Sequence, residues 1–265
     1  MKLVLLLCVF TCCILTSTWC SPTSRIIGGE SVVRGDYPWV TLVEAFNGGQ
    51  VISYCGGSLI SSSFVLTAAQ CIEGADKARI WLGAYNISNP LEFSRVRLNA
   101  TSFYTHPDYN NAFYDNDIAL IRLPRTVSSS PYISPATLPT QEIADLNLEG
   151  IYGTMLGWGF ISQNYNKMHD VLMKSPNRVI APSTCETRYG AGWMSPNKYC
   201  VETAGGRGPC FGDSGGALMA HNEDGSPVVF AIFSFLDTDS CIQGIPVGYT
   251  KVGAYLDWIK GIAGV

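Results

Sequence analysis

The chain has 265 residues, of which 14% are charged, and its formal net charge is −4. Its 27 glycines and 14 prolines indicate a compact, turn-rich protein and argue against a coiled coil or a disordered chain. The slight acidic excess gives no reason to expect nucleic acid as a partner.

The first segment has the layout of a secretory signal peptide. Lys2 precedes an apolar run over residues 3–15, and a polar stretch then ends at Cys20. A charged start, a short apolar core and a small-residue exit are typical of such signals, with a buried N-terminal helix as the alternative. The run is too short to span a bilayer, and no later stretch is long enough. We therefore expect residues 1–20 to be removed and the protein to be secreted, extracellular and free of the membrane.

The cysteine content fits export. Four of the ten cysteines would leave with the signal peptide, and six remain, namely Cys55, Cys71, Cys185, Cys200, Cys210 and Cys241. An even number in an exported chain suggests three disulfides, with 15 possible pairings. No pair has zinc-finger spacing, so no metal is expected. Two sequons, at Asn86 and Asn99, are candidate glycosylation sites.

From residue 26 onward, short apolar and β-branched segments alternate with turn signals. The segments are residues 39–44, 51–60, 64–69, 79–85, 118–123 and 228–236. Many short strands at this spacing predict an all-β sandwich or barrel. Helical periodicity is clear only at the end, where Val252, Tyr255, Leu256, Ile259 and Ile262 fall on one face.

Four motifs follow one another along the chain. They are Arg25-Ile26-Ile27-Gly28-Gly29, Leu66-Thr67-Ala68-Ala69-Gln70-Cys71, Asp115-Asn116-Asp117-Ile118-Ala119-Leu120 and Gly212-Asp213-Ser214-Gly215-Gly216. Their order and spacing resemble the chymotrypsin-like serine peptidase family, over a match from Ile26 to about Ile262. Three further phrases look most like digestive chymotrypsins of insects and crustaceans, namely residues 82–85, 157–159 and 255–259.

The resemblance implies a fold and a disulfide pattern. We expect two six-stranded antiparallel β-barrels, at about residues 26–140 and 141–250, with the active site between them and a C-terminal helix after them. The implied disulfides are Cys55–Cys71, Cys185–Cys200 and Cys210–Cys241. No cofactor is implied.

The resemblance also assigns the catalytic positions. Ser214 matches the nucleophile, Asp117 matches the buried carboxylate that orients the base, and the backbone N–H groups of Gly212 and Ser214 match the oxyanion hole. Where the family has its general-base histidine, this sequence has Gln70. Glutamine cannot take up and return a proton near neutral pH, but its amide can donate to Asp117 and accept from Ser214. We therefore expect intact architecture without a general base.

The bond between Arg25 and Ile26 matches the family's activation site. Cleavage there by a trypsin-like protease would release residues 21–25 and free the α-amine of Ile26. In the family this amine pairs with the carboxylate beside the nucleophile, which is Asp213 here, and orders the oxyanion hole and the pocket.

The specificity pocket departs from the family pattern. Its expected residues are Gly208, Ser234, Phe235, Leu236 and Val247. Leu236 stands where a glycine normally admits the substrate side chain, Val247 lies on the pocket wall, and Gly208 replaces a polar or acidic residue at the base. We expect a narrowed or closed pocket. The three histidines, His106, His169 and His221, are expected on the solvated surface, where none can replace the missing base.

These features predict a serine protease homologue that has become a binding or regulatory protein. Its expected partners are proteins or peptides, such as a protease inhibitor or an active protease, and we expect a monomer. The alternative is an active peptidase with impaired or unconventional catalysis that prefers small residues before the scissile bond. A purely structural or storage role has no feature in its favour.

Overall fold

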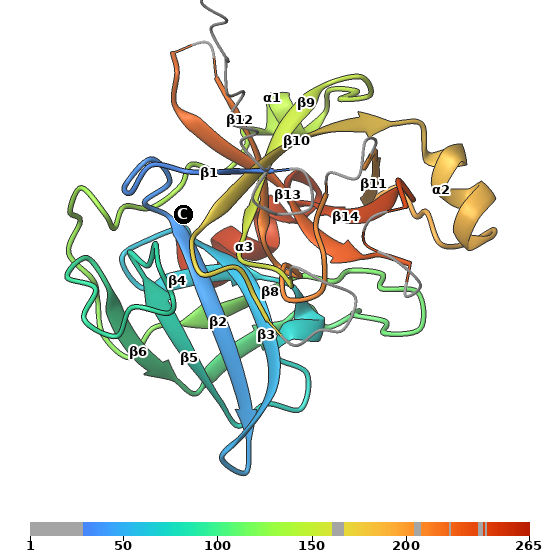
Figure 1. Cartoon of the computed structure of the whole chain (residues 1–265). Helices are drawn as coiled ribbons and strands as arrows, with labels where there is room; N and C mark the ends of the chain where they lie inside the picture. Colours follow the sequence, from blue (N-terminus) through green and yellow to red (C-terminus); the bar gives the residue numbers. More distant parts are fainter. Residues whose placement is uncertain (1–28, 161–166, 204–207, 223, 238–240, 242) are drawn as a thin grey trace, which may run out of the picture.

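The computed structural model describes residues 29–160, 167–203, 208–222, 224–237, 241 and 243–265 (Figure 1). The strands form two antiparallel sheets, one below the other in Figure 1, and few residues are helical. The signal peptide, the activation site and the amine of Ile26 lie outside the described residues and stay predictions.

The first sheet closes into a barrel. Its strands are β2 (Val40–Asn47), β3 (Gln50–Leu59), β4 (Phe64–Thr67), β5 (Lys77–Leu82), β6 (Val96–Ala100), β7 (Ser102–Thr105) and β8 (Ala119–Arg122), in the order β6-β5-β2-β3-β4-β8-β7. Only Thr101 separates β6 from β7, so the two are halves of one bent strand. Because the halves pair with β5 and β8, the barrel has six strands.

The second sheet closes in the same way. Its strands are β9 (Tyr152–Gly157), β10 (Met173–Ile180), β11 (Lys198–Val201), β12 (Ala217–His221), β13 (Pro227–Phe235) and β14 (Val247–Lys251), and pairing of β10 with β9 completes six strands. The short β1 (Glu30–Ser31) pairs with β10, so the start of the described chain joins the second barrel. The expected division at about residue 140 had assigned this segment to the first barrel. The predicted fold of two six-stranded barrels is confirmed.

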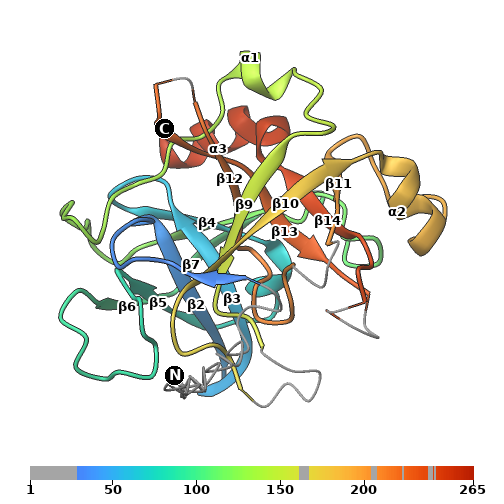
Figure 2. The same cartoon turned by 45° about the horizontal axis from the view of Figure 1, so that its top comes forward.

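The helices are short. They are η2 (Ala69–Cys71), α1 (Gln141–Ala144), α2 (Pro182–Tyr189), η3 (Val252–Tyr255) and α3 (Leu256–Ala263). η3 and α3 form the predicted C-terminal helix, which buries Val252, Tyr255 and Ile259 (Figure 2). Nowhere in the described chain is a helix both long and apolar enough to cross a membrane.

The barrels meet through close backbone contact beside a disulfide. A Cβ added to Gly56 on β3 would lie 2.6 Å from the α-carbon of Gly216, which leads into β12. The disulfide Cys55–Cys71 ties β3 to η2 and so fixes the segment that carries Gln70. The other expected disulfides, Cys185–Cys200 and Cys210–Cys241, are also formed.

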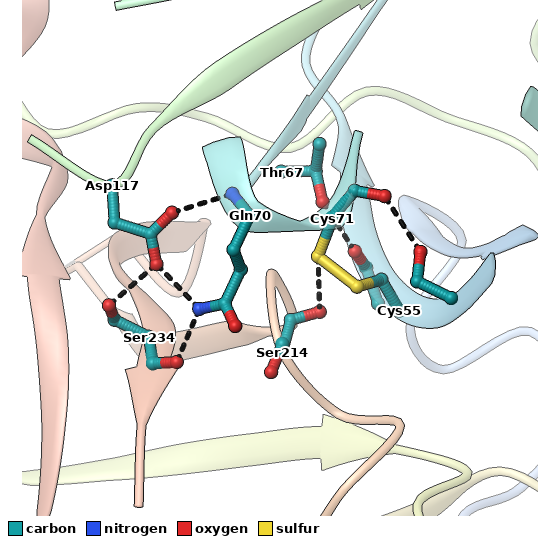
Figure 3. Close-up of a disulfide and its surroundings, with 9 residues drawn as sticks. Cys55, Thr67, Gln70, Cys71, Asp117, Ser214 and Ser234 are labelled. Carbon is teal, nitrogen blue, oxygen red and sulfur yellow. Dashed lines mark hydrogen bonds between the residues drawn. A yellow bond between two sulfur atoms is a disulfide. The ribbon is translucent and has the colours of Figure 1, made fainter. Parts of the chain in front are cut away.

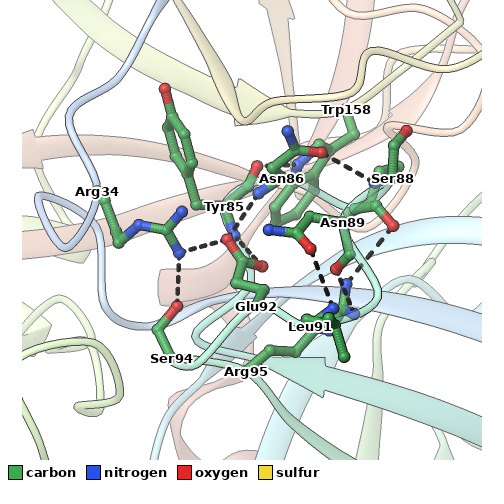
Figure 4. Close-up of polar contacts among 11 residues, drawn as sticks. Arg34, Tyr85, Asn86, Ser88, Asn89, Leu91, Glu92, Ser94, Arg95 and Trp158 are labelled. Atoms are coloured by element: carbon green, nitrogen blue, oxygen red, sulfur yellow. Dashed lines mark hydrogen bonds and ion pairs between the residues drawn. The ribbon is translucent and has the colours of Figure 1, made fainter.

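A buried carboxylate organises the loop between β5 and β6 (Figure 4). Glu92 forms an ion pair with Arg34 and accepts hydrogen bonds from the backbone N–H groups of Tyr85 (3.0 Å) and Asn86 (2.9 Å). Of the two sequon asparagines, Asn86 is half-buried in this loop, whereas Asn99 is exposed on β6. Glycosylation at either stays a prediction.

Candidate active site

The junction of the barrels brings together the residues that the motifs singled out. Gln70 lies in η2, Asp117 precedes β8, Ser214 lies in the turn before β12, and Ser234 is near the end of β13 (Figure 3). The Sγ atom of Cys71 lies 3.4 Å from the Ser214 carbonyl oxygen, so the disulfide packs directly against the backbone of Ser214.

Asp117 is completely buried and held by neutral donors. Its carboxylate accepts hydrogen bonds from the Gln70 backbone N–H (3.0 Å), the Gln70 Nε2 (2.7 Å) and the Ser234 hydroxyl (2.6 Å). Burial raises the pKa of Asp117, and the hydrogen bonds oppose this shift. Within the described residues no cation pairs with this carboxylate.

Two acceptors fix the amide of Gln70. Its Nε2 donates to Asp117 and also to the backbone oxygen of Ser234 (2.5 Å). Since an ionised carboxylate and a carbonyl can only accept, the nitrogen must point at them, and Oε1 faces the side where Ser214 lies (Figure 3).

The expected hydrogen bond from Ser214 to Gln70 is not formed. Among the described residues, the Ser214 hydroxyl has no hydrogen-bond partner. The amide cannot turn toward the serine without losing its bonds to Asp117 and Ser234. Gln70 therefore satisfies the buried carboxylate but does not hydrogen-bond to the Ser214 hydroxyl.

The backbone around Ser214 leaves two donors free. Neither the Gly212 N–H nor the Ser214 N–H donates to an acceptor in the part of the chain described. Gly212 (φ 89°) and Gly215 (φ 77°) adopt left-handed backbone, and a Cβ at Gly215 would lie 2.2 Å from Oγ1 of Thr67. Such a turn can present both N–H groups to a developing oxyanion.

Asp213 is a second buried carboxylate, only 1% exposed. It accepts from the backbone N–H groups of Gly159 (2.7 Å) and Cys210 (3.0 Å). A Cβ at Gly157 or Gly159 would lie 2.0 Å from its oxygens, so both glycines are needed to admit it. Burial raises the pKa of Asp213 to about 7, and the two backbone hydrogen bonds oppose this shift.

We expect Asp213→Asn to remove a pH dependence from the stability of the uncleaved chain. The folded pKa of about 7 lies above the ordinary 3.8, so the folded state binds more protons between these values and Asp213 lowers stability as pH rises through them. Over this pH range the loss in the free energy of unfolding amounts to up to about 4 kcal/mol. Urea unfolding of parent and variant at pH 4, 5.5 and 7.5 measures the difference.

The difference in unfolding free energy between the parent and the Asp213→Asn variant isolates the contribution of Asp213. Burial lowers the pKa of His169 to about 4, which makes stability rise with pH between 4 and 6.5 in both proteins alike. A parent-minus-variant difference that stays constant across this range would contradict the assignment.

The expected pocket residues lie together and are tightly packed. Phe235 and Val247 are each 3% exposed, and Leu236 is half-buried against the second barrel's core. The Phe235 ring covers Gly248, where an added Cβ would lie 2.0 Å from it. At the base, a Cβ on Gly208 would lie 2.6 Å from the methyl group of buried Thr203.

An aromatic cluster that the sequence analysis missed covers Phe235. Its ring stacks on Tyr114 (centroids 6.0 Å apart, planes at 18°) and meets the rings of Trp193 (5.2 Å) and Tyr189 (5.1 Å). Tyr114 comes from the loop before Asp117, and Tyr189 and Trp193 come from the end of α2 and the loop after it. Side chains from two loops thus cover Phe235.

A buried lysine joins these two loops. Lys198, whose side chain is 1% exposed, pairs with Asp115 (2.7 Å) and donates to the backbone oxygens of Phe113 (2.7 Å) and Trp193 (2.8 Å). Its ammonium also lies 5.5 Å from the Phe235 ring centre, and burial lowers the pKa of Lys198. The only signal in the sequence was a lysine directly before the apolar pair Tyr199-Cys200.

The histidines differ from the surface expectation. His221 is exposed as expected, whereas His169 is buried (7% exposed) and His106 is half-buried in contact with the rings of Tyr255 and Trp258. The expectation was wrong for His169 because its loop packs onto the backbone of Trp158 and does not project into solvent. None of the three contacts Ser214 or Asp117 in the described structure, so none stands in for Gln70.

Comparison with known proteins gives concordant matches. A family model described as Trypsin matches residues 26–259. Chymotrypsin from Phaedon cochleariae is 35% identical over 90% of this chain and 82% of its own, and brachyurin from Leptuca pugilator is 34% identical over 91% and 99%. The solved structure of HL collagenase is 31% identical, covers 91% of this chain and 99% of its own, and superposes with a TM-score of 0.80.

Proposed function

Because the chain belongs to the chymotrypsin-like serine peptidase family, we propose that it is a secreted serine protease homologue without peptidase turnover, which acts by binding. One observation carries this proposal. Both hydrogens of the Gln70 amide are committed, to Asp117 and to Ser234, and a neutral amide has no basic nitrogen. Ser214 therefore has a hydroxyl but no group that removes its proton.

The packing around Phe235 also argues against peptidase turnover. A peptide residue would need to enter beside Phe235 and Leu236, where buried aromatic rings and Val247 occupy the walls. The three disulfides are typical of exported proteins and support secretion. The proposed partners are a protease inhibitor or an active protease, bound by the monomer after a trypsin-like protease has cut between Arg25 and Ile26.

A second function, an impaired but active peptidase, is favoured by one feature. The free N–H groups of Gly212 and Ser214 are the part of the machinery that stabilises the tetrahedral intermediate. An oxyanion hole and binding alone can supply about 10³–10⁴-fold acceleration over water. Residual activity of this size would be measurable with reactive substrates.

The deciding experiment uses the protein cut after Arg25. We expect no turnover of a peptide-substrate panel and labelling of Ser214 by a fluorophosphonate probe far slower than that of active chymotrypsin. The Ser214→Ala variant sets the background. Stoichiometric labelling within minutes, together with turnover that Ser214→Ala abolishes, would establish the impaired peptidase instead.

A further inference from the structure

On the outer face of the first barrel, lysine and arginine side chains form cation–π contacts with aromatic rings. On this face the Lys77 ammonium and the Arg79 guanidinium lie 4.7 and 4.9 Å from the ring centre of Phe46. Two further guanidinium groups, of Arg95 and Arg97, lie 4.4 and 5.5 Å from the ring centre of Trp81. We call the surface formed by Phe46, Lys77, Arg79, Trp81, Arg95 and Arg97 the β5–β6 face.

The strand register explains the arrangement. On β5, Lys77, Arg79 and Trp81 alternate with the buried Ala78, Ile80 and Leu82, so they share the outward side. Trp81 pairs with Arg97 on β6, and Lys77 pairs with Phe46 on β2. Figure 1 shows β6, β5 and β2 side by side in the lower left of the picture.

This face is positive in an acidic protein. The chain carries a net charge of −4, yet in the part of it that the structure describes Glu44 is the one carboxylate that forms an ion pair with these four cations, through Arg79 (2.8 Å). Arg95 donates to the backbone oxygen of Asn89 (2.7 Å; Figure 4). Within the described residues, Lys77, Arg95 and Arg97 have no carboxylate partner.

A groove of mixed character adjoins the face. It has a volume of about 490 Å³, and its apolar lining residues are Leu42, Tyr54, Trp81, Ile87, Phe160 and Met168. Its polar lining residues are Ser88, Lys167 and two carboxylates, Glu44 and Asp170, which form ion pairs with Arg79 and Lys167. Tyr54 is 38% exposed at its rim. One of its lining residues approaches Gly212, because the Phe160 ring lies 3.4 Å from the Cβ position of that glycine.

We propose that the β5–β6 face and this groove form a docking site for an acidic, extended segment of a protein partner. Lys77 and Trp81 are four residues apart on β5, a span of about 13 Å, which an extended peptide of similar length follows. Carboxylates of the segment pair with Lys77, Arg95 and Arg97, and an aromatic or aliphatic side chain enters the groove. The site requires no chemistry at Ser214 and so goes beyond the proposed function.

A fluorescein-labelled random copolymer of glutamate and tyrosine tests the site by fluorescence anisotropy at low ionic strength. We expect binding that weakens as salt is raised and that falls about tenfold or more in the triple variant Lys77→Gln/Arg95→Gln/Arg97→Gln. Lys251→Gln is the matched control, because its ammonium also lies over a ring, 4.7 Å from the centre of Tyr199, but on the second barrel. All proteins carry Asn99→Gln, which removes the candidate glycosylation site on this face, where Asn99 pairs with Arg79.

A second variant separates the groove from general polyanion binding. Tyr54→Ala should weaken binding of the copolymer several-fold and leave binding of labelled polyglutamate unchanged. Circular dichroism verifies that each variant is folded. The proposal is overturned if the triple variant binds the copolymer as the Lys251→Gln control does. It is also overturned if heparin and polyglutamate compete as well as the copolymer does, because the face would then be a nonspecific polyanion or glycan surface.

Discussion

The Gln70→His variant should acylate Ser214 about 10³-fold faster or more than the parent. In the parent, Nε2 of residue 70 bonds Asp117 at 2.7 Å, and the amide oxygen faces the side of Ser214 (Figure 3). An imidazole in the same space can donate from one nitrogen to Asp117 and present the other to the serine. p-Nitrophenyl acetate measures the step, because this small ester does not need the specificity pocket.

Two controls show whether the increase in acylation rate has the expected cause. Adding Ser214→Ala to the Gln70→His variant should abolish it, which assigns the reaction to the serine. The pH profile of the single variant should rise through an apparent pKa above 6.5, because the buried Asp117 carboxylate favours the imidazolium form. A variant no faster than the parent after cleavage at Arg25 would mean that the N–H groups of Gly212 and Ser214 do not act as an oxyanion hole.

The Gln70→His substitution should raise the rate of reaction with peptide substrates much less than the rate with the small ester. The rings around Phe235 and the side chains of Leu236 and Val247 are unchanged by the substitution and still occupy the place of a substrate side chain. The ratio of the two gains thus measures how much the pocket substitutions add to the loss of the base.

Local motifs made the catalytic core predictable from sequence. Gly212 and Gly215 belong to the motif around Ser214, and both have positive φ, which glycine adopts readily. Gln70 and Asp117 were placed together by motif order, and two hydrogen bonds join them. The disulfide pairing came from the resemblance alone, because the six cysteines by themselves left 15 pairings open.

Contacts between distant segments could not be predicted. The orientation of the Gln70 amide depends on the backbone oxygen of Ser234, 164 residues away. The Lys198 ammonium bonds to a carbonyl 85 residues away, through a loop in which Tyr114 and Asn116 both adopt positive φ (53°). No pattern in the sequence reports that Tyr114 takes this strained backbone or that Lys198 is buried by it.

Removing the partner of this buried lysine should be costly. We expect Asp115→Ala to lower the free energy of unfolding by about 3 kcal/mol, because it leaves an ammonium buried without its carboxylate. The ammonium stays enclosed, since its side chain is 1% exposed and its other acceptors are the carbonyls of Phe113 and Trp193. Urea denaturation at pH 7 measures the change.

The double variant Lys198→Met/Asp115→Ala should be no less stable than Asp115→Ala alone, because it removes the uncompensated charge and keeps most of the buried volume. Glu202→Ala is the matched control, since it breaks a half-exposed ion pair with Arg178 and should cost less than about 1 kcal/mol. If Asp115→Ala costs no more than this control, the ammonium does not hold the two loops together. The cover over Phe235 would then rest on ring packing alone, and a partner could displace it without breaking an ion pair.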